Sequence, residues 1–239
     1  MQILEGEGVR KHFGGLAAVT DVDFHIDQGE ILGLIGPNGA GKTTLFNLIS
    51  GSLLPTSGII RFKGENITGL RPHKICKRGM ARTFQLVKLF GNMTVLENVL
   101  LGSLFGTPMV MRESNAKRES LELLEFVGLS AMEGVPARDL TVANQKRLEV
   151  ARALATKPEL LLLDEVMAGL TPTEVGSAIE LIRKIGNRGI TVFMIEHVMK
   201  AIMTVSHRII VLHHGEKIAE GIPEEIATNP KVIEIYLGT

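Results

Sequence analysis

Nine consecutive residues carry the first recognisable chemistry of this chain. They read Gly36, Pro37, Asn38, Gly39, Ala40, Gly41, Lys42, Thr43 and Thr44, and they fit the pattern G-x-x-x-x-G-K-[ST]. Glycines at these positions let the backbone curl until successive N–H groups point inward, where they can bind phosphate oxygens. Lys42 can reach the β- and γ-phosphates of a nucleotide, and the Thr43 hydroxyl can bind a magnesium ion. The pattern predicts a site for a nucleoside triphosphate with Mg²⁺.

The segments on either side of this loop fit the same interpretation. Residues 30–35 form a short apolar run, which predicts a buried strand that enters the loop. Residues 42–49 predict a helix whose positive dipole end lies under the phosphates. Strand, loop and helix is the order that the motif requires. We therefore interpret residues 36–44 as a phosphate-binding loop rather than a chance glycine-rich turn.

A second apolar run ends in two carboxylates. Residues 160–163 are four leucines, and Asp164 and Glu165 follow directly. Because side chains alternate along a strand, these two carboxylates are expected to point to different sides. Asp164 could bind Mg²⁺, directly or through water, and Glu165 could act as general base for a water beyond the γ-phosphate. Acidic residues are also common at a helix start, but the phosphate-binding loop upstream favours the catalytic interpretation.

Composition narrows the class of protein. Charges balance, with 26 Lys and Arg against 26 Asp and Glu, so no basic surface for nucleic acid is indicated. The single cysteine, Cys76, excludes an internal disulfide and is typical of a reducing compartment. No apolar run approaches the roughly 18 residues that cross a bilayer. The mean hydropathy of +0.22 is nevertheless high, which indicates a large buried sheet and leaves room for an apolar partner surface.

The remaining patterns predict one α/β domain over residues 1–239. Apolar runs at residues 19–26, 59–63, 191–195 and 209–212 predict strands, and the pattern of residues 88–150 is helical. Turn residues flank the first two runs, which indicates a small antiparallel sheet beside the nucleotide. We expect a nucleotide-binding core with this β-subdomain from residues 1–87 and 150–239. The inserted helical subdomain is expected over residues 88–149.

These motifs resemble, in order and spacing, those of the ATP-binding cassette (ABC) ATPases over essentially the whole chain. The resemblance is carried by the loop of residues 36–44, Gln85, residues 140–150, residues 160–165 and His197. Four finer stretches are similar to LivG-type ATP-binding subunits of bacterial branched-chain amino-acid importers. They are residues 81–85, 93–99, 195–197 and 230–238.

The resemblance implies a fold and a set of residue roles. The fold would be a P-loop NTPase with a RecA-like core, an antiparallel β-subdomain and an inserted helical subdomain. Phe13 would stack on adenine, Gln85 would contact Mg²⁺ and the attacking water, and His197 would contact the γ-phosphate. The segment of residues 86–93 would meet a coupling helix of the membrane subunits. Its apolar members fit an ordinary core equally well; they are Leu86, Val87, Leu89 and Phe90.

The resemblance also implies partners and a location. The chain would close on ATP as a pair with a second ATPase subunit and drive transmembrane permease subunits. A periplasmic binding protein would supply the solute, and the chain would lie at the cytoplasmic face of the inner membrane as a peripheral subunit. Because other subunits select the solute, urea or other amide-like solutes remain alternatives to branched-chain amino acids. A mechanical ATPase of DNA repair or translation is disfavoured, since neither a coiled-coil insertion nor a second cassette is present.

One segment departs from the family pattern. Where ABC ATPases usually have Leu-Ser-Gly-Gly-Gln, the signature that binds the partner's ATP, this chain has Leu140, Thr141, Val142, Ala143 and Asn144. Thr141 keeps a hydroxyl that could cap the next helix, but a β-branched valine restricts a backbone that glycine leaves free. We expect a weakened composite site, which favours a heterodimer with a second ATPase over a homodimer. A regulatory subunit with little hydrolysis is the alternative.

A basic stretch precedes Gln85 and has two interpretations. It contains Arg71, Lys74, Lys77, Arg78 and Arg82, together with His73. A solvated helix face would present such charges to water. Alternatively, the stretch would attract anionic lipid headgroups beneath the membrane subunits.

Overall fold

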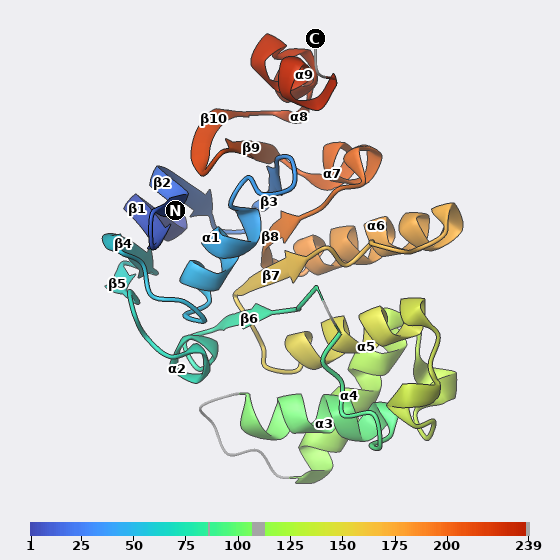
Figure 1. Ribbon diagram of the computed structural model, residues 1–239. Coiled ribbons are helices and arrows are strands. Elements are labelled where there is room, and N and C mark those ends of the chain that lie inside the picture. The colour runs from blue at the N-terminus through green and yellow to red at the C-terminus, as the bar shows by residue number, and fades with distance from the viewer. Residues whose placement is uncertain (86, 107–112, 238–239) are drawn as a thin grey trace.

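The computed structural model describes residues 1–85, 87–106 and 113–237. A six-stranded sheet with the order β10-β9-β3-β8-β7-β6 runs through its centre (Figure 1). The strands are β3 (Ile31–Ile35), β6 (Met80–Arg82), β7 (Leu160–Asp164), β8 (Thr191–Ile195), β9 (Arg208–His213) and β10 (Glu216–Gly221). All neighbours in this sheet pair in parallel except β9 and β10, which are antiparallel. Because both faces of the sheet are covered by other elements, β3, β7 and β8 are buried along their whole length, and this explains their uninterrupted apolar sequences.

A second, antiparallel sheet lies beside the first, as the turn residues around residues 19–26 and 59–63 predicted. Its order is β2-β1-β4-β5. The strands are β1 (Gln2–Phe13), β2 (Leu16–Asp27), β4 (Ser57–Phe62) and β5 (Glu65–Asn66). The inner face of this sheet, helix α1 (Lys42–Ile49) and one face of the central sheet share a single apolar cluster around Phe46, Phe62 and Phe193. That shared core fixes the phosphate-binding loop between the two sheets.

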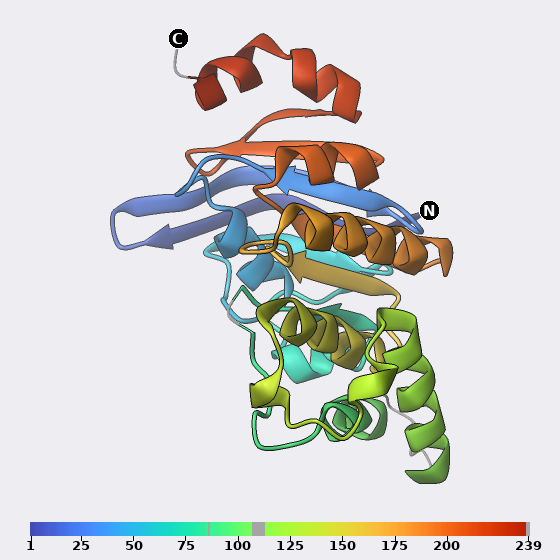
Figure 2. The same cartoon turned by 90° about the vertical axis from the view of Figure 1, so that its right-hand side faces the viewer.

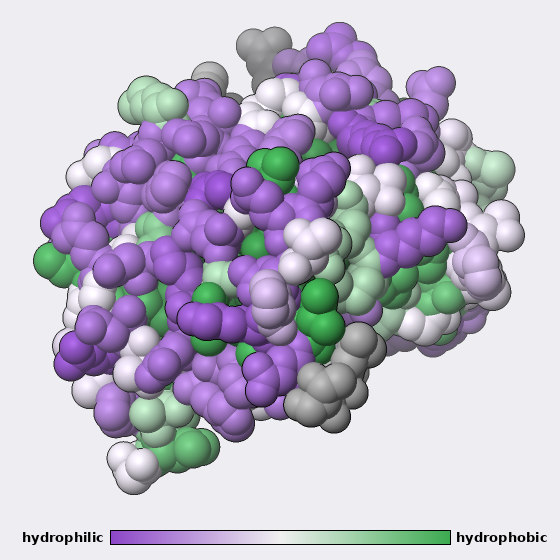
Figure 3. Space-filling view, turned by 90° about the horizontal axis from the view of Figure 1, so that it is seen from above, coloured by the Kyte–Doolittle hydropathy of each residue, from purple (hydrophilic) through white to green (hydrophobic). Residues whose placement is uncertain are grey.

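The opposite face of the central sheet packs against helices. These are α5 (Val142–Leu154), α6 (Pro172–Asn187), α7 (Met199–Val205) and α8 (Pro223–Thr228), with α9 (Pro230–Leu237) beyond them. Figure 2 shows α6 and α7 on this face of the sheet and α8 and α9 at the far end. The face that carries the C-terminal helices is mostly hydrophilic, and its hydrophobic side chains lie in small separate groups (Figure 3).

The helical insertion has its own apolar core. It contains α3 (Val95–Phe105), α4 (Glu113–Val127), the N-terminal part of α5 and two short 3₁₀ turns, η1 (Ser130–Met132) and η2 (Ala137–Asp139). Val99, Leu124 and Leu148 meet in the centre of this core and are fully buried. The predicted boundary between residues 149 and 150 falls inside α5, which runs without interruption from the insertion onto the central sheet. One rigid helix therefore joins the two parts.

Four strands had no prediction: β1, β5, β6 and β10. The basic stretch is also not one helix, because α2 spans only Pro72–Cys76 and Arg82 lies in β6. Among the residues that the structure describes, none of the helices combines the length and the apolar character that a bilayer crossing demands.

Candidate active site

Four neighbouring parallel strands end at one edge of the central sheet and bring the predicted site residues together. The phosphate-binding loop follows β3, Gln85 follows β6, Glu165 follows β7 and His197 follows β8. Carboxyl ends of parallel strands are where α/β sheets usually bind ligands. Side chains that are 80 and 32 positions apart in the sequence, Gln85 and His197 relative to Glu165, are therefore in direct contact.

The loop has the backbone shape that its glycines allow. Gly39 and Gly41 have positive φ angles of 81° and 98°, which side chains disfavour. A Cβ added to Gly41 would lie 2.3 Å from the carbonyl oxygen of Ala18 in β2, so β2 packs directly on the loop. Gly41 is also the N-cap of α1, and glycine has no side chain to occupy the free amides of the first turn. These amides and the helix dipole are available to an anion.

Lys42 is buried at the start of α1. Its Nζ donates to the carbonyl oxygens of Gly36, at 2.6 Å, and Pro37, at 3.0 Å. Burial lowers the pKa of this ammonium, while Glu165 and Asp164 nearby oppose that shift. The two carboxylates thus stabilise a cation at the mouth of the loop. Thr43 is exposed in the same helical turn, as a ligand for a metal next to the phosphates requires.

The Glu165 carboxylate is held between two side chains. Its Oε1 lies 2.9 Å from His197 Nε2, and its Oε2 accepts a hydrogen bond of 2.9 Å from Gln85 Nε2. The carboxylate is mostly buried, whereas the imidazole is about half exposed, at 11% and 44% of their side-chain surfaces. An orienting group on each side fixes a carboxylate for proton transfer. Sequence analysis predicted all three residues, and the structure brings them into contact.

Asp164 points to other partners, as strand alternation predicted. Its Oδ2 accepts a bond of 2.7 Å from Arg82, and both side chains are almost fully buried, at 1% and 7% exposure. Arg82 also donates to Asn47 Oδ1 and Ser50 Oγ in α1, at 2.7 and 2.8 Å. The interpretation of the whole basic stretch as a solvated face is wrong for Arg82. This side chain joins β6, β7 and the helix of the phosphate-binding loop.

The residues that were predicted to bind Mg²⁺ fit that ion. Asp164 Oδ1 is buried and has no hydrogen-bond partner among the described residues. Burial raises the pKa of the Asp164 carboxyl, and the bond from Arg82 opposes the shift. Carboxylate and hydroxyl oxygens such as those of Asp164 and Thr43 are the kind of ligand that Mg²⁺ prefers. The magnesium role of Thr43, Gln85 and Asp164 stays a prediction.

Phe13 is exposed to solvent, as a ring that stacks on a base would need to be. It ends β1 in the hairpin with β2, its side chain is 46% exposed, and Lys11 Nζ lies 5.1 Å from its ring centroid. The same hairpin contacts the phosphate-binding loop through Ala18. An exposed aromatic ring on a hairpin whose other strand packs on the loop is compatible with adenine stacking.

The altered signature forms the start of α5. Thr141 is the N-cap, and its side chain accepts a hydrogen bond from the amide of Asn144, as predicted for its hydroxyl. Val142 is 56% exposed, whereas Ala143 and Leu140 are buried. The helix start is therefore intact, and Val142, in place of a glycine of the family pattern, presents an exposed branched side chain there.

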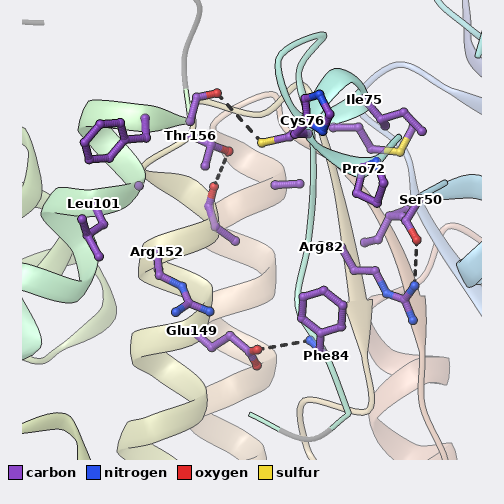
Figure 4. A pocket seen from close by; sticks show the side chains of 18 of the residues that line it. Ser50, Pro72, Ile75, Cys76, Arg82, Phe84, Leu101, Glu149, Arg152 and Thr156 are labelled. Carbon is purple, nitrogen blue, oxygen red and sulfur yellow. Dashed lines mark hydrogen bonds between the residues drawn. The ribbon is translucent and has the colours of Figure 1, made fainter. Parts of the chain in front are cut away.

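A groove lies between the helical insertion and the core, close to Gln85 (Figure 4). It has a volume of about 410 Å³, and Phe90 and Phe105 are exposed on it. The labelled lining residues include Leu101 from α3, Glu149 and Arg152 from α5, and Arg82 and Phe84 on the opposite wall. Sequence analysis allowed four apolar residues of the segment 86–93 to be either core or interface residues. Of these, Leu89 packs against the helical core and Phe90 lines the groove. Val87 is half-buried, and Leu86 lies outside the described residues.

Sequence analysis missed four buried charged residues around the site. Arg82 is described above, and Glu149 Oε1 accepts the amides of Phe84 and Lys88, which flank the Gln85 segment. Lys146 and Glu196 hold the turn that follows β7. Each of the four lies in a quoted motif, and a buried charge within a motif is the sign that could have identified them. Their burial, however, is decided by packing between distant segments.

Glu196 makes stability depend on pH. Burial raises the pKa of this carboxyl from 4.5 to about 7, although the Met167 amide donates to its Oε1 at 2.8 Å. The folded chain then binds a proton that the unfolded chain releases between pH 4.5 and 7, so stability falls as pH rises through this window. The loss should total up to about 3 kcal/mol and be complete above pH 7. Glu196→Gln should flatten this part of the profile.

Unfolding free energies measured by denaturant titration from pH 5 to 8 test this expectation. Glu180→Gln, on the exposed face of α6, is the matched control and should keep the wild-type slope. An unchanged slope in Glu196→Gln would assign the pH dependence to other groups.

The fold and the site together define a P-loop nucleoside triphosphatase. The family model for ABC transporters matches residues 19–168, and the model for the branched-chain amino acid ATP-binding cassette transporter matches residues 216–239. The chain is 43% identical to the high-affinity branched-chain amino acid transport ATP-binding protein BraF of Pseudomonas aeruginosa, over 99% of this chain and 98% of that protein. It is 42% identical to LivG of Escherichia coli with the same coverage.

Solved structures agree with this result. A crystal structure of the ADP conformation of MJ1267, an ATP-binding cassette of an ABC transporter, matches with a TM-score of 0.90 and 33% identity. The match covers the whole of both chains. This chain therefore belongs to the ABC transporter family, among the LivG-type ATP-binding proteins of branched-chain amino acid transport. As a member it is an ATP-binding and ATP-hydrolysing subunit.

Proposed function

We propose that this chain hydrolyses ATP at the site formed by residues 36–44, Asp164 and Glu165, and thereby energises uptake of branched-chain amino acids through separate membrane subunits. One observation carries the site assignment: the Glu165 carboxylate lies between Gln85 and His197 at the edge of the sheet that carries the phosphate-binding loop. The relatives BraF and LivG, named as high-affinity branched-chain amino acid transport proteins, support the choice of solute.

In the proposed mechanism each residue has a distinct task. The amides at the start of α1 and the Lys42 ammonium bind the phosphates and stabilise the charge that develops on them. Gln85 and His197 orient the water for in-line attack on the γ-phosphate, and Glu165 accepts the proton of that water. Thr43, Gln85 and Asp164 would hold Mg²⁺, which would supply positive charge against the phosphates. Phe13 stacks on the adenine.

The subunit acts in a pair, and the altered signature favours a heterodimer. In ABC ATPases each ATP lies between one chain's phosphate-binding loop and the other chain's signature. Here the exposed Val142 side chain and the loss of both glycines weaken the contribution of residues 140–144 to the partner's ATP. The chain's own loop, Glu165 and His197 are complete. A second ATPase with an intact signature would therefore restore one full site.

We expect low ATPase activity from this chain alone and a rise on the order of 10-fold or more when its partner ATPase is added, because backbone donors to the γ-phosphate are restored. The double variant Val142→Gly/Ala143→Gly should raise the activity of the chain alone. Val142→Ala is the matched control, since it shortens the side chain but keeps a Cβ. Full activity of the unmodified chain alone would contradict the heterodimer and favour a homodimer.

The groove next to Gln85 supports a docking site for the membrane subunits. Phe90 and Phe105 offer exposed aromatic surface there, while the wall contains the buried Glu149 and the half-buried Arg152. A short helix of a permease subunit fits such a groove, because apolar anchors bury well against aromatic side chains. With this docking the chain would be a peripheral subunit at the cytoplasmic face of the inner membrane. The periplasmic binding protein would act on it only through the permease.

A further inference from the structure

The turn that carries Glu165 has a strained backbone. Glu165 has a φ of 51°, in the left-handed region that residues other than glycine rarely adopt. Such a conformation persists only where the surroundings hold it. Its amide donates to the Ile195 carbonyl of β8 at 2.9 Å, which fixes the peptide group before Glu165. The orientation of the peptide group after Glu165 depends on what binds the Glu165 carbonyl oxygen.

Lys146 binds that oxygen and closes the turn. The residue is only 8% exposed, and its Nζ donates to the carbonyl oxygens of Glu165 at 2.9 Å and Ala168 at 2.6 Å. The Ala168 amide donates to the same Glu165 oxygen at 3.2 Å. One ammonium therefore bridges the first and last residues of the turn. Between them, the Met167 amide donates to Glu196.

The burial of this ammonium needs compensation. Burial lowers the pKa of Lys146, while the carboxylates of Glu196, Glu149 and Glu165 oppose the shift and keep a cation favourable there. A lysine with a purely solvated role would extend into water. Two short bonds to main-chain oxygens of one turn indicate instead that the ammonium fixes the backbone of that turn.

We propose that Lys146 is a positioning residue for Glu165: it holds the left-handed peptide so that the carboxylate meets Gln85 and His197. Lys146 lies on α5, whose first turn is the altered signature, residues 140–144. A movement of α5 is thus transmitted to the backbone of the general base through one ammonium. This inference rests on the proposed role of Glu165 as the base.

The test uses Lys146→Met in the assembled transporter, which keeps the length of the side chain but removes its donors. We expect kcat for ATP to fall on the order of 10- to 100-fold, because a small displacement of a reacting group costs that much. The KM and the equilibrium binding of ATP should change less than about 2-fold, since Lys146 contacts no predicted phosphate ligand. Arg147→Met removes a cation from the next position of α5 and is the matched control. A kcat within 2-fold of this control would overturn the proposal.

A double variant, Lys146→Met combined with Glu165→Gln, separates this inference from the proposed function. In Glu165→Gln the added Lys146→Met change should have no further effect on turnover, because residues that act through one group are non-additive. If Glu165→Gln alone leaves turnover intact, the assignment of the base fails. If it abolishes turnover while Lys146→Met does not reduce it, only the positioning role fails.

Amide hydrogen exchange gives a readout independent of activity. Lys146→Met should speed exchange at residues 165–168 on the order of 10-fold relative to Arg147→Met, because the turn loses two bonds. If the methionine variant does not fold, Lys146→Gln retains one amide donor and should show the same change to a smaller extent. Equal exchange rates at residues 165–168 in the folded variant and the control would contradict the proposal that Lys146 holds this turn.

Discussion

Replacing Glu165 with Gln should lower ATP turnover by about 10²- to 10⁴-fold and leave ATP binding nearly unchanged. The amide has the shape of the carboxylate and can keep a hydrogen bond to Gln85 or His197, but it cannot accept the proton of the attacking water. Losses of this size are typical when a general base is removed. Because only the chemical step is affected, the ATPase pair should stay closed on bound ATP.

Single-turnover hydrolysis and equilibrium binding of ATP by the assembled transporter measure the two effects separately. Glu122→Gln, on the exposed face of α4, is a control for the same chemical change away from the site. Unchanged solute transport in Glu165→Gln would favour the alternative of a regulatory subunit whose partner performs hydrolysis.

Replacing Arg82 with Met should lower the thermal midpoint of unfolding on the order of 10 °C. The change leaves the buried Asp164 carboxylate without its cation, and breaking a buried ion pair costs about 3–5 kcal/mol. In a chain of this size each kcal/mol corresponds to roughly 2–4 °C. Nucleotide should recover part of the loss, because Mg²⁺ would supply a cation at Asp164.

Two further variants decide whether the ion pair is responsible. Arg183→Met breaks an exposed pair with Glu180 on α6 and should cost at most about 1 kcal/mol. Arg82→Met/Asp164→Asn removes both charges and should be more stable than Arg82→Met alone. A midpoint of Arg82→Met no lower than that of Arg183→Met would show that the buried pair contributes nothing.

Most of the site contacts that sequence analysis did not predict are made by buried charged side chains. Arg82 and Asp164 are 82 positions apart, and their contact exists only because β6 and β7 pair in parallel. Nothing in the basic stretch distinguished the one buried arginine from its exposed neighbours. Lys146 likewise lies just after the altered signature, residues 140–144, and no local pattern marks it as buried.

The sequence by itself determined the features that depend on neighbouring residues. The phosphate-binding loop needs particular residue types at fixed short spacing, so residues 36–44 identified it completely. The runs at β7 and β8 predicted their strands because a strand buried on both faces must be apolar throughout. The cap at Thr141 followed from one hydroxyl at the start of a helix.

Tertiary structure decided everything that depends on which strands are neighbours. The order β3-β8-β7-β6 sets the loop, His197, Glu165 and Gln85 side by side, and no local pattern specifies that order. It also decided the left-handed backbone of Glu165, because intrinsic preference disfavours that conformation and only bonds from distant residues stabilise it. Short-range sterics and periodicity can be recognised along the chain, whereas long-range packing selects among contacts that the sequence allows equally.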